Sequence, residues 1–182
     1  MKYSIQDLSL NMPVNSQKFK KIVKYFAESD IPNTYFVAPV SDNPCLTPVL
    51  DSIPPANHGK NYWDGFAAVL VARGLPEIDD VKADMLHWLE DINWPGNASI
   101  IIFVKQNLSA FRDEIFSALK EAYENKDIIW FENLLHCFLS GSTYAREILE
   151  YLKEDCWKDF DMIYGIDNVL QRLHCEFEKI QK

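Results

Sequence analysis

The sequence is poor in the residues from which nucleotide and metal sites are usually built. It holds only six glycines, and none of them falls in a GxSxG, Walker or Rossmann pattern. The four histidines show no HExxH or other paired-ligand spacing. The sequence therefore indicates no catalytic residue, no metal site and no cofactor, and any thiol–imidazole pair would have to be assembled by the fold.

Cysteine and long apolar runs are equally scarce. The four cysteines lie far apart without a CxxC pair, at Cys45, Cys137, Cys156 and Cys175. With no leader-like N-terminus, they are expected to be reduced thiols, which predicts a cytoplasmic location. No run approaches the ~18 apolar residues that a membrane span requires.

Positive charge is outweighed by negative charge. Eighteen lysines and arginines face 27 acidic residues, which gives a formal net charge of −9. This balance argues against nucleic acid and anionic membranes as partners and favours a basic protein. The local exception is a group of lysines near the N-terminus, which we interpret as a solvated helix face: Lys18, Lys20, Lys21 and Lys24.

Aromatic side chains and helical periodicity are abundant. Aromatic residues make up 13% of the chain and are expected to fill a core. Apolar residues recur every three or four positions, which predicts an all-α fold of stacked antiparallel helix pairs. The predicted helices cover about residues 16–30, 63–73, 76–92, 100–104, 109–124, 127–140, 143–152 and 161–180, and Ser16, Ser109 and Asp127 are expected to cap three of them.

Two of these segments rest on particular patterns. The stripe over 76–92 is the clearest in the chain and comprises Ile78, Val81, Met85, Trp88, Leu89 and Ile92. The run 100–104 suits either a buried strand or a buried helix, and its helical neighbours favour a helix.

Proline divides the chain into two parts. Six of the nine prolines fall between residues 31 and 60, a density that excludes a helix or a central strand. We therefore predict an N-terminal helix and an extended proline-rich arm over 1–60, packed on a helical domain over 61–182. The oligomeric state stays open.

A weak internal repeat is typical of HEAT-type helix pairs. Leu135-His136-Cys137 recurs as Leu173-His174-Cys175 after 38 residues, and Leu86-His87-Trp88 lies 49 residues before the first copy.

The segment from Met85 to Pro95, MLHWLEDINWP, resembles the signature of a bacterial family called domain of unknown function 5071. A downstream Ile129-Trp130 pair also fits, and the resemblance covers about residues 65–180. It implies a small HEAT-like helical fold and no established activity. Gly96 departs from the apolar residue expected after the proline, and Trp94 is expected to wedge between two helices.

Two groups of residues are candidate binding sites. Polar and aromatic side chains gather in residues 58–64, HGKNYWD, where the arm enters the helical body, and the strongest candidates among them are His58, Tyr62, Trp63 and Asp64. Carboxylates follow the polar side of the predicted 76–92 helix, of which Asp80, Asp84 and Asp91 are the strongest candidates.

The sequence thus favours a non-enzymatic protein-interaction module, of the immunity or inhibitor type, that binds a basic partner. The alternative is an enzyme, foremost a HEAT-like DNA glycosylase, which would need a continuous basic groove.

Overall fold

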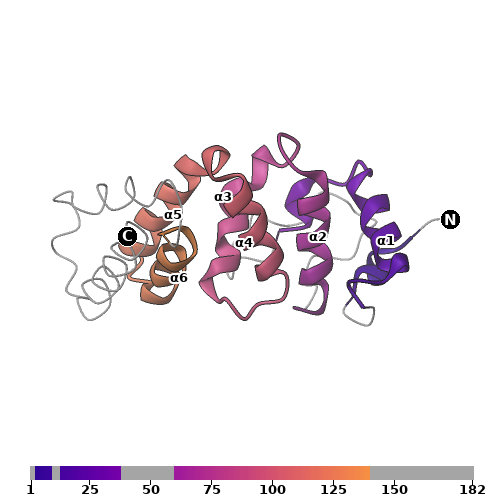
Figure 1. The fold of residues 1–182 in the computed structure, drawn as a ribbon, viewed down its shortest axis with the longest axis horizontal. Helices are drawn as coiled ribbons and strands as arrows, with labels where there is room; N and C mark the ends of the chain where they lie inside the picture. The colour runs from indigo at the N-terminus through magenta and orange to yellow at the C-terminus, as the bar shows by residue number, and fades with distance from the viewer. Residues whose placement is uncertain (1–2, 10–12, 38–59, 140–182) are drawn as a thin grey trace, which may run out of the picture. The chain divides into compact units, whose positions relative to one another are not determined.

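The computed structural model describes residues 3–9, 13–37 and 60–139, and all regular structure in these ranges is helical (Figure 1). Helices account for 73% of the described residues, and no strand occurs among them. The predicted all-α class is confirmed. Residues 38–59 of the predicted proline-rich arm, which include His58, and the helices predicted beyond Gly141 lie outside the described residues. At the start of the arm the short 3₁₀ helix η2, Asn33–Tyr35, follows Pro32, so the expected absence of helix does not hold there.

The chain divides into two compact units. The first comprises residues 1–88 and 92–103, and the second comprises residues 89–91 and 104–182.

The first unit is built around the helix pair α1 and α2, which pack directly against each other. α1 spans Gln17–Ala27, ends three residues earlier than predicted, and is capped by Ser16, whose hydroxyl accepts the Phe19 N–H (3.1 Å). α2 spans Trp63–Arg73, as predicted, and ends at Gly74 with φ +70°. The short helix η1, Ile5–Leu8, packs on both.

The prediction of a single helix over residues 76–92 is wrong. Three short segments replace it: η4 (Asp79–Val81), α3 (Lys82–Leu86) and η5 (His87–Glu90). The apolar stripe nevertheless points inward, since Ile78, Val81, Met85, Trp88 and Leu89 are all fully buried. Ile92 is the exception and is 55% exposed, because the helical rotation that would have carried it inward ends before it.

α4, Asn97–Gln106, confirms the helical interpretation of residues 100–104, and its last three residues fall in the second unit. Ser109 does not cap the next helix, because it lies inside η6 (Leu108–Ala110) and α5 begins only at Arg112.

The second unit centres on the hairpin of α5 (Arg112–Glu124) and α6 (Ile128–Leu139). Asp127 caps α6 as predicted, since its carboxylate accepts the Trp130 N–H (2.9 Å).

Candidate functional site

A lysine and two tryptophans form the most distinctive cluster in the described residues. The indole rings of Trp63 and Trp94 meet edge to face with their centroids 5.0 Å apart. The ammonium group of Lys60 lies 5.6 Å from the first ring centroid and 5.2 Å from the second. Among the described residues Lys60 forms no ion pair, so the two aromatic rings are the electrostatic partners of its charge.

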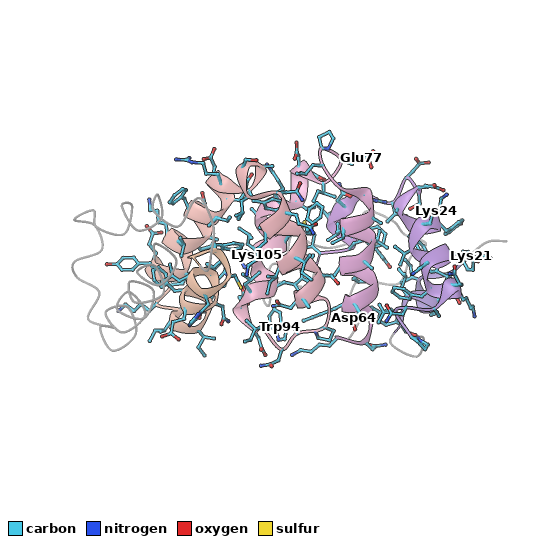
Figure 2. The ribbon with its side chains drawn as sticks, in the orientation of Figure 1. Lys21, Lys24, Asp64, Glu77, Trp94 and Lys105 are labelled. Atoms are coloured by element: carbon cyan, nitrogen blue, oxygen red, sulfur yellow. The ribbon has the colours of Figure 1, made fainter. Side chains whose placement is uncertain are left out.

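Asp64 joins this cluster to the loop that precedes α4. Its carboxylate accepts the Gly96 N–H across 32 positions of sequence (2.6 Å). Figure 2 shows Asp64 at the start of α2 and Trp94 in the loop before α4, at the same end of both helices. This bond holds the 94–96 loop against the first turn of α2, where a carboxylate is also favoured by the helix dipole.

The other side of the same loop is held by Trp88. Its indole Nε1 donates to the Pro95 carbonyl oxygen (2.9 Å), and its own carbonyl oxygen accepts from Nδ2 of Asn97 (2.5 Å). Both Trp88 and Asn97 are almost fully buried. The position of Trp94 is therefore fixed from two sides.

The two tryptophans differ in exposure. Trp63 is buried, with 5% of its surface exposed, and its indole N–H has no hydrogen-bond partner within the described part of the chain. Trp94 is only half-buried, and its ring contacts α2 through Trp63. Its exposed surface, next to an exposed Lys60, leaves the cluster open to solvent on one side.

Of the residues proposed from the sequence, the structure brings together Trp63 and Asp64, with Lys60 of the same 58–64 stretch, and it adds Trp94 to them. Tyr62 lies beside the cluster but is half-buried, and its ring stacks on Phe66 (centroids 6.1 Å apart, 28° between planes). No sequence signal pointed to Lys60 and Trp94 as neighbours, since 34 positions separate them.

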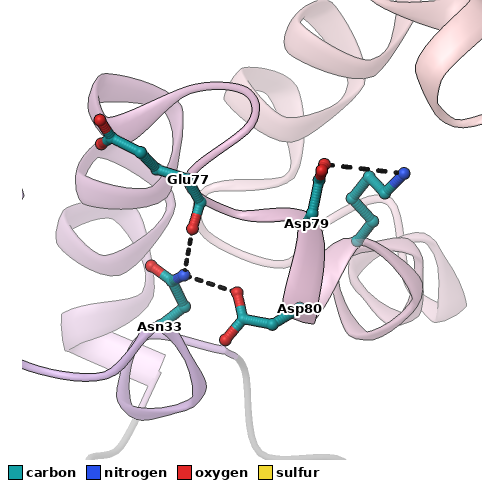
Figure 3. A network of polar contacts seen from close by, with 5 residues as sticks. Asn33, Glu77, Asp79 and Asp80 are labelled. Atoms are coloured by element: carbon teal, nitrogen blue, oxygen red, sulfur yellow. Dashed lines mark hydrogen bonds and ion pairs between the residues drawn. The ribbon is translucent and has the colours of Figure 1, made fainter.

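The acidic candidates do not form one helix face, because the helix expected to present them is broken. Asp80 lies in η4, where it accepts a hydrogen bond from the Asn33 amide (2.6 Å; Figure 3). Asp79 pairs with Lys82 (3.7 Å). Asp84 lies in α3, while Asp91 is half-buried and belongs to the second unit. Asp79 and Asp80 thus serve two separate contacts, with Lys82 and with Asn33.

A polar network around Asn33 and Arg73 was not foreseen from the sequence. The Asn33 amide nitrogen donates to the Glu77 carbonyl oxygen (2.6 Å) as well as to Asp80, and its amide oxygen accepts from Nη1 of Arg73 (2.6 Å). Nη2 of Arg73 donates to the Phe26 and Ser29 carbonyl oxygens (both 3.1 Å). The hydrogen-bonded residues of this network lie 40 or more positions apart in the sequence, so no local sequence pattern reveals the network.

Asp84 has a perturbed environment. Partial burial raises the pKa of its carboxyl group, the charge of His87 acts in the opposite direction, and Asp80 adds to the rise. The folded protein therefore holds the proton of this carboxyl group more tightly than the unfolded chain does.

This shift predicts how stability depends on pH. Above the ordinary aspartate pKa of about 4, the free energy of unfolding should fall as pH rises through the folded pKa of Asp84, because the native state must give up a proton that the unfolded chain has already lost. Asp84→Asn should remove this loss and be more stable than the native protein at neutral pH, with the difference vanishing in acid. Urea unfolding across pH measures it, with the exposed Asp30→Asn as control. An identical pH profile for Asp84→Asn and the native protein would contradict the prediction.

The chemistry of the cluster favours positive charge, because indole faces and a nearby carboxylate both attract it. No group of three potential metal ligands occurs in ranges 3–9, 13–37 and 60–139. Cys137, in α6, is a free, buried thiol. Burial raises the pKa of this thiol, and Lys105 lowers it to a lesser extent.

None of the described helices has both the length and the apolar character needed to cross a membrane.

Fold and side-chain geometry together define an all-α protein in which a lysine lies over a pair of tryptophan rings. The family described as "Domain of unknown function (DUF5071)" matches residues 66–160, just over half of the chain, and the chain belongs to that family. Trp94 lies within the matched region, whereas Lys60, Trp63 and Asp64 precede it. No curated protein and no solved structure matches the chain.

Proposed function

We propose that this protein is a protein-interaction module that binds a basic segment of a partner protein, and that the Trp63–Trp94 pair receives a cationic side chain of that partner. The supporting observation is the position of Lys60, whose ammonium lies over both indole rings. A ring pair that attracts an internal lysine offers the same attraction to a lysine or arginine from outside.

Lys60 in this proposal is an internal occupant that the partner displaces. Its side chain is exposed and forms no ion pair with a described carboxylate, so few interactions oppose its departure. The net charge of −9 would speed the encounter with a basic protein, while the aromatic site would supply affinity and position.

The biological setting that this chemistry suits is an immunity or inhibitor protein that covers a basic partner. We propose that HEAT-like stacking of the helix pairs presents the site, in a bacterial cytoplasm where thiols such as Cys137 stay reduced.

Binding of a fluorescein-labelled peptide of about ten lysines, followed by fluorescence anisotropy, tests the proposal. Lys60→Ala should bind the peptide more tightly than the native protein, because the internal competitor is gone. Trp94→Ala should bind about tenfold more weakly, which corresponds to the loss of about 1.4 kcal/mol of cation–π attraction. Trp94→Phe should recover part of the loss, since it restores an aromatic face.

The matched control is Lys105→Ala, which removes one positive charge from another exposed position, the labelled residue in α4 of Figure 2. If Lys60→Ala and Lys105→Ala tighten binding equally, net charge alone accounts for the effect and the tryptophan site is refuted. Preferential binding of a DNA oligonucleotide would instead favour the glycosylase alternative.

A further inference from the structure

The exposed side of α1 is a basic surface within an acidic protein. Its four lysines, Lys18, Lys20, Lys21 and Lys24, are all exposed, while the opposite side buries Phe19, Ile22, Val23 and Phe26. Positions three and four apart are neighbours on a helix, so the lysines form one continuous face, hereafter the lysine face. Figure 2 shows Lys21 and Lys24 on the side of α1 away from α2.

The lysine face is unfavourable for the helix on its own. Lys18 lies in the first turn, which contains no acidic residue, so its charge opposes the positive end of the helix dipole. Lys18 and Lys21, Lys21 and Lys24, and Lys20 and Lys24 are like-charged pairs at spacings that destabilise a helix. Only Lys24 has a carboxylate partner among the described residues, the exposed Glu28 at 3.6 Å. Local features that oppose folding are expected where a surface serves another purpose.

The rest of the chain limits what this surface can bind. Removing the four positive charges of α1 from the net charge of −9 leaves −13 for the remainder. A long polyanion such as nucleic acid would extend beyond α1 and meet this negative charge. The apolar side of α1 is buried in the first unit, so the helix has no free face with which to enter a bilayer.

We propose that the lysine face of α1 binds a short acidic segment of a partner protein. Lys18, Lys21 and Lys24 follow one another at about one helical turn, a spacing that carboxylates on an acidic helix or extended segment can match. The surface is separate from the tryptophan site and attracts the opposite charge, so the two proposals stand or fall separately.

The test uses the full chain and a fluorescein-labelled peptide of about ten glutamates, with anisotropy measured at low and near-physiological salt. The triple variant Lys18→Gln/Lys20→Gln/Lys21→Gln should lose at least about tenfold in affinity. The matched control, Lys105→Gln/Lys120→Gln/Lys126→Gln, removes the same charge from three exposed lysines elsewhere and should lose less than about threefold.

A second measurement separates binding from misfolding. Without peptide, the α1 triple variant should melt at the same or a higher temperature than the native protein, because like-charge repulsion is relieved. Equal loss of affinity in both triple variants, or no binding of the glutamate peptide to the native protein, would overturn the proposal. Tighter α1-dependent binding of a single-stranded RNA or of anionic vesicles would overturn it as well. The lysine peptide serves as an internal check, since it should bind the α1 variant at least as well as the native protein.

Discussion

Gly96→Ala is expected to destabilise the protein by about 4 kcal/mol, through the combination of a strained backbone and a steric clash. Gly96 has a φ of +86°, in the left-handed region that side chains rarely adopt. A Cβ atom there would lie 2.7 Å from the carbonyl oxygen of Trp63 and 2.7 Å from Cβ of Ala67. Both contacts are with the α2 helix, which cannot yield as a flexible side chain would.

Substitutions at two other glycines measure the backbone strain and the steric clash separately. Gly74 also has a positive φ, +70°, but a Cβ there has open space, with its nearest neighbour 4.0 Å away. Gly74→Ala should therefore cost only the backbone strain, about 1–2 kcal/mol. At Gly65 a Cβ would lie 2.5 Å from the Leu8 carbonyl oxygen without a positive φ, so Gly65→Ala measures the clash alone.

The midpoint and slope of urea unfolding measure all three variants. A Gly96→Ala loss no greater than that of Gly74→Ala would show that the 94–96 loop moves away from α2 at little cost. In that case the variant should also weaken binding of the lysine peptide, because the same loop positions Trp94 against Trp63.

The departure of Gly96 from the expected family pattern now has a physical explanation. The sequence shows that an apolar residue is missing after Pro95, but it does not show that Trp63 and Ala67 approach that point. The hydrogen bond from Gly96 to Asp64 requires that approach. A residue choice that looks neutral in the sequence is therefore set by a contact 32 positions away.

Helices were predictable where local signals agreed with one another. Ser16, Gly74 and Asp127 each marked a helix boundary that the structure confirms, because caps act over three or four residues. The apolar stripe over 78–92 correctly identified buried residues except at Ile92, which is exposed. It did not identify the helix type, because a 3₁₀ segment and an α-helix bury similar positions over so short a stretch. The prediction that Ser109 caps a helix was wrong, because Ser109 lies within η6 and α5 begins only after it.

The candidate site was predictable only in part. Aromatic and polar residues near the start of α2 suggested Trp63 and Asp64, which are neighbours in sequence. Lys60 precedes Trp63 by three positions and belongs to the same stretch. Trp94 depends on the loop before α4 folding back on α2, a tertiary contact that no periodicity contains. The acidic face was inferred from one unbroken helix, so the breaks around Lys82 and His87 removed its geometric basis.

Arg73→Ala is expected to destabilise the protein by about 3 kcal/mol, because it leaves several half-buried acceptors without their donor. The guanidinium group joins the end of α2 to the carbonyl oxygens of Phe26 and Ser29 and to Asn33, and it lies 5.0 Å from the Phe36 ring centroid. Burial lowers the pKa of Arg73, while the charges of Glu77 and Asp80 oppose this effect. The group nevertheless stays charged at neutral pH.

Arg73→Lys should recover less than half of the loss. One ammonium group cannot reproduce the planar fork that directs Nη1 to Asn33 and Nη2 to two carbonyl oxygens at once. Arg112→Ala is the matched control, since Arg112 also lies 5.0 Å from a phenylalanine ring centroid and pairs with a carboxylate, but at an exposed position. It should cost less than about 1 kcal/mol.

Combining Arg73→Ala with Asn33→Ala tests whether the two side chains act as one unit. Because Arg73 donates to Asn33, which in turn bonds the Glu77 carbonyl oxygen and Asp80, the double variant should lose clearly less than the sum of the two single losses. Urea unfolding of the four proteins gives the coupling free energy, expected at about 1 kcal/mol or more. Strict additivity would mean that Arg73 stabilises the first unit through the Phe26 and Ser29 carbonyl groups alone, and that Asn33 acts independently on Glu77 and Asp80.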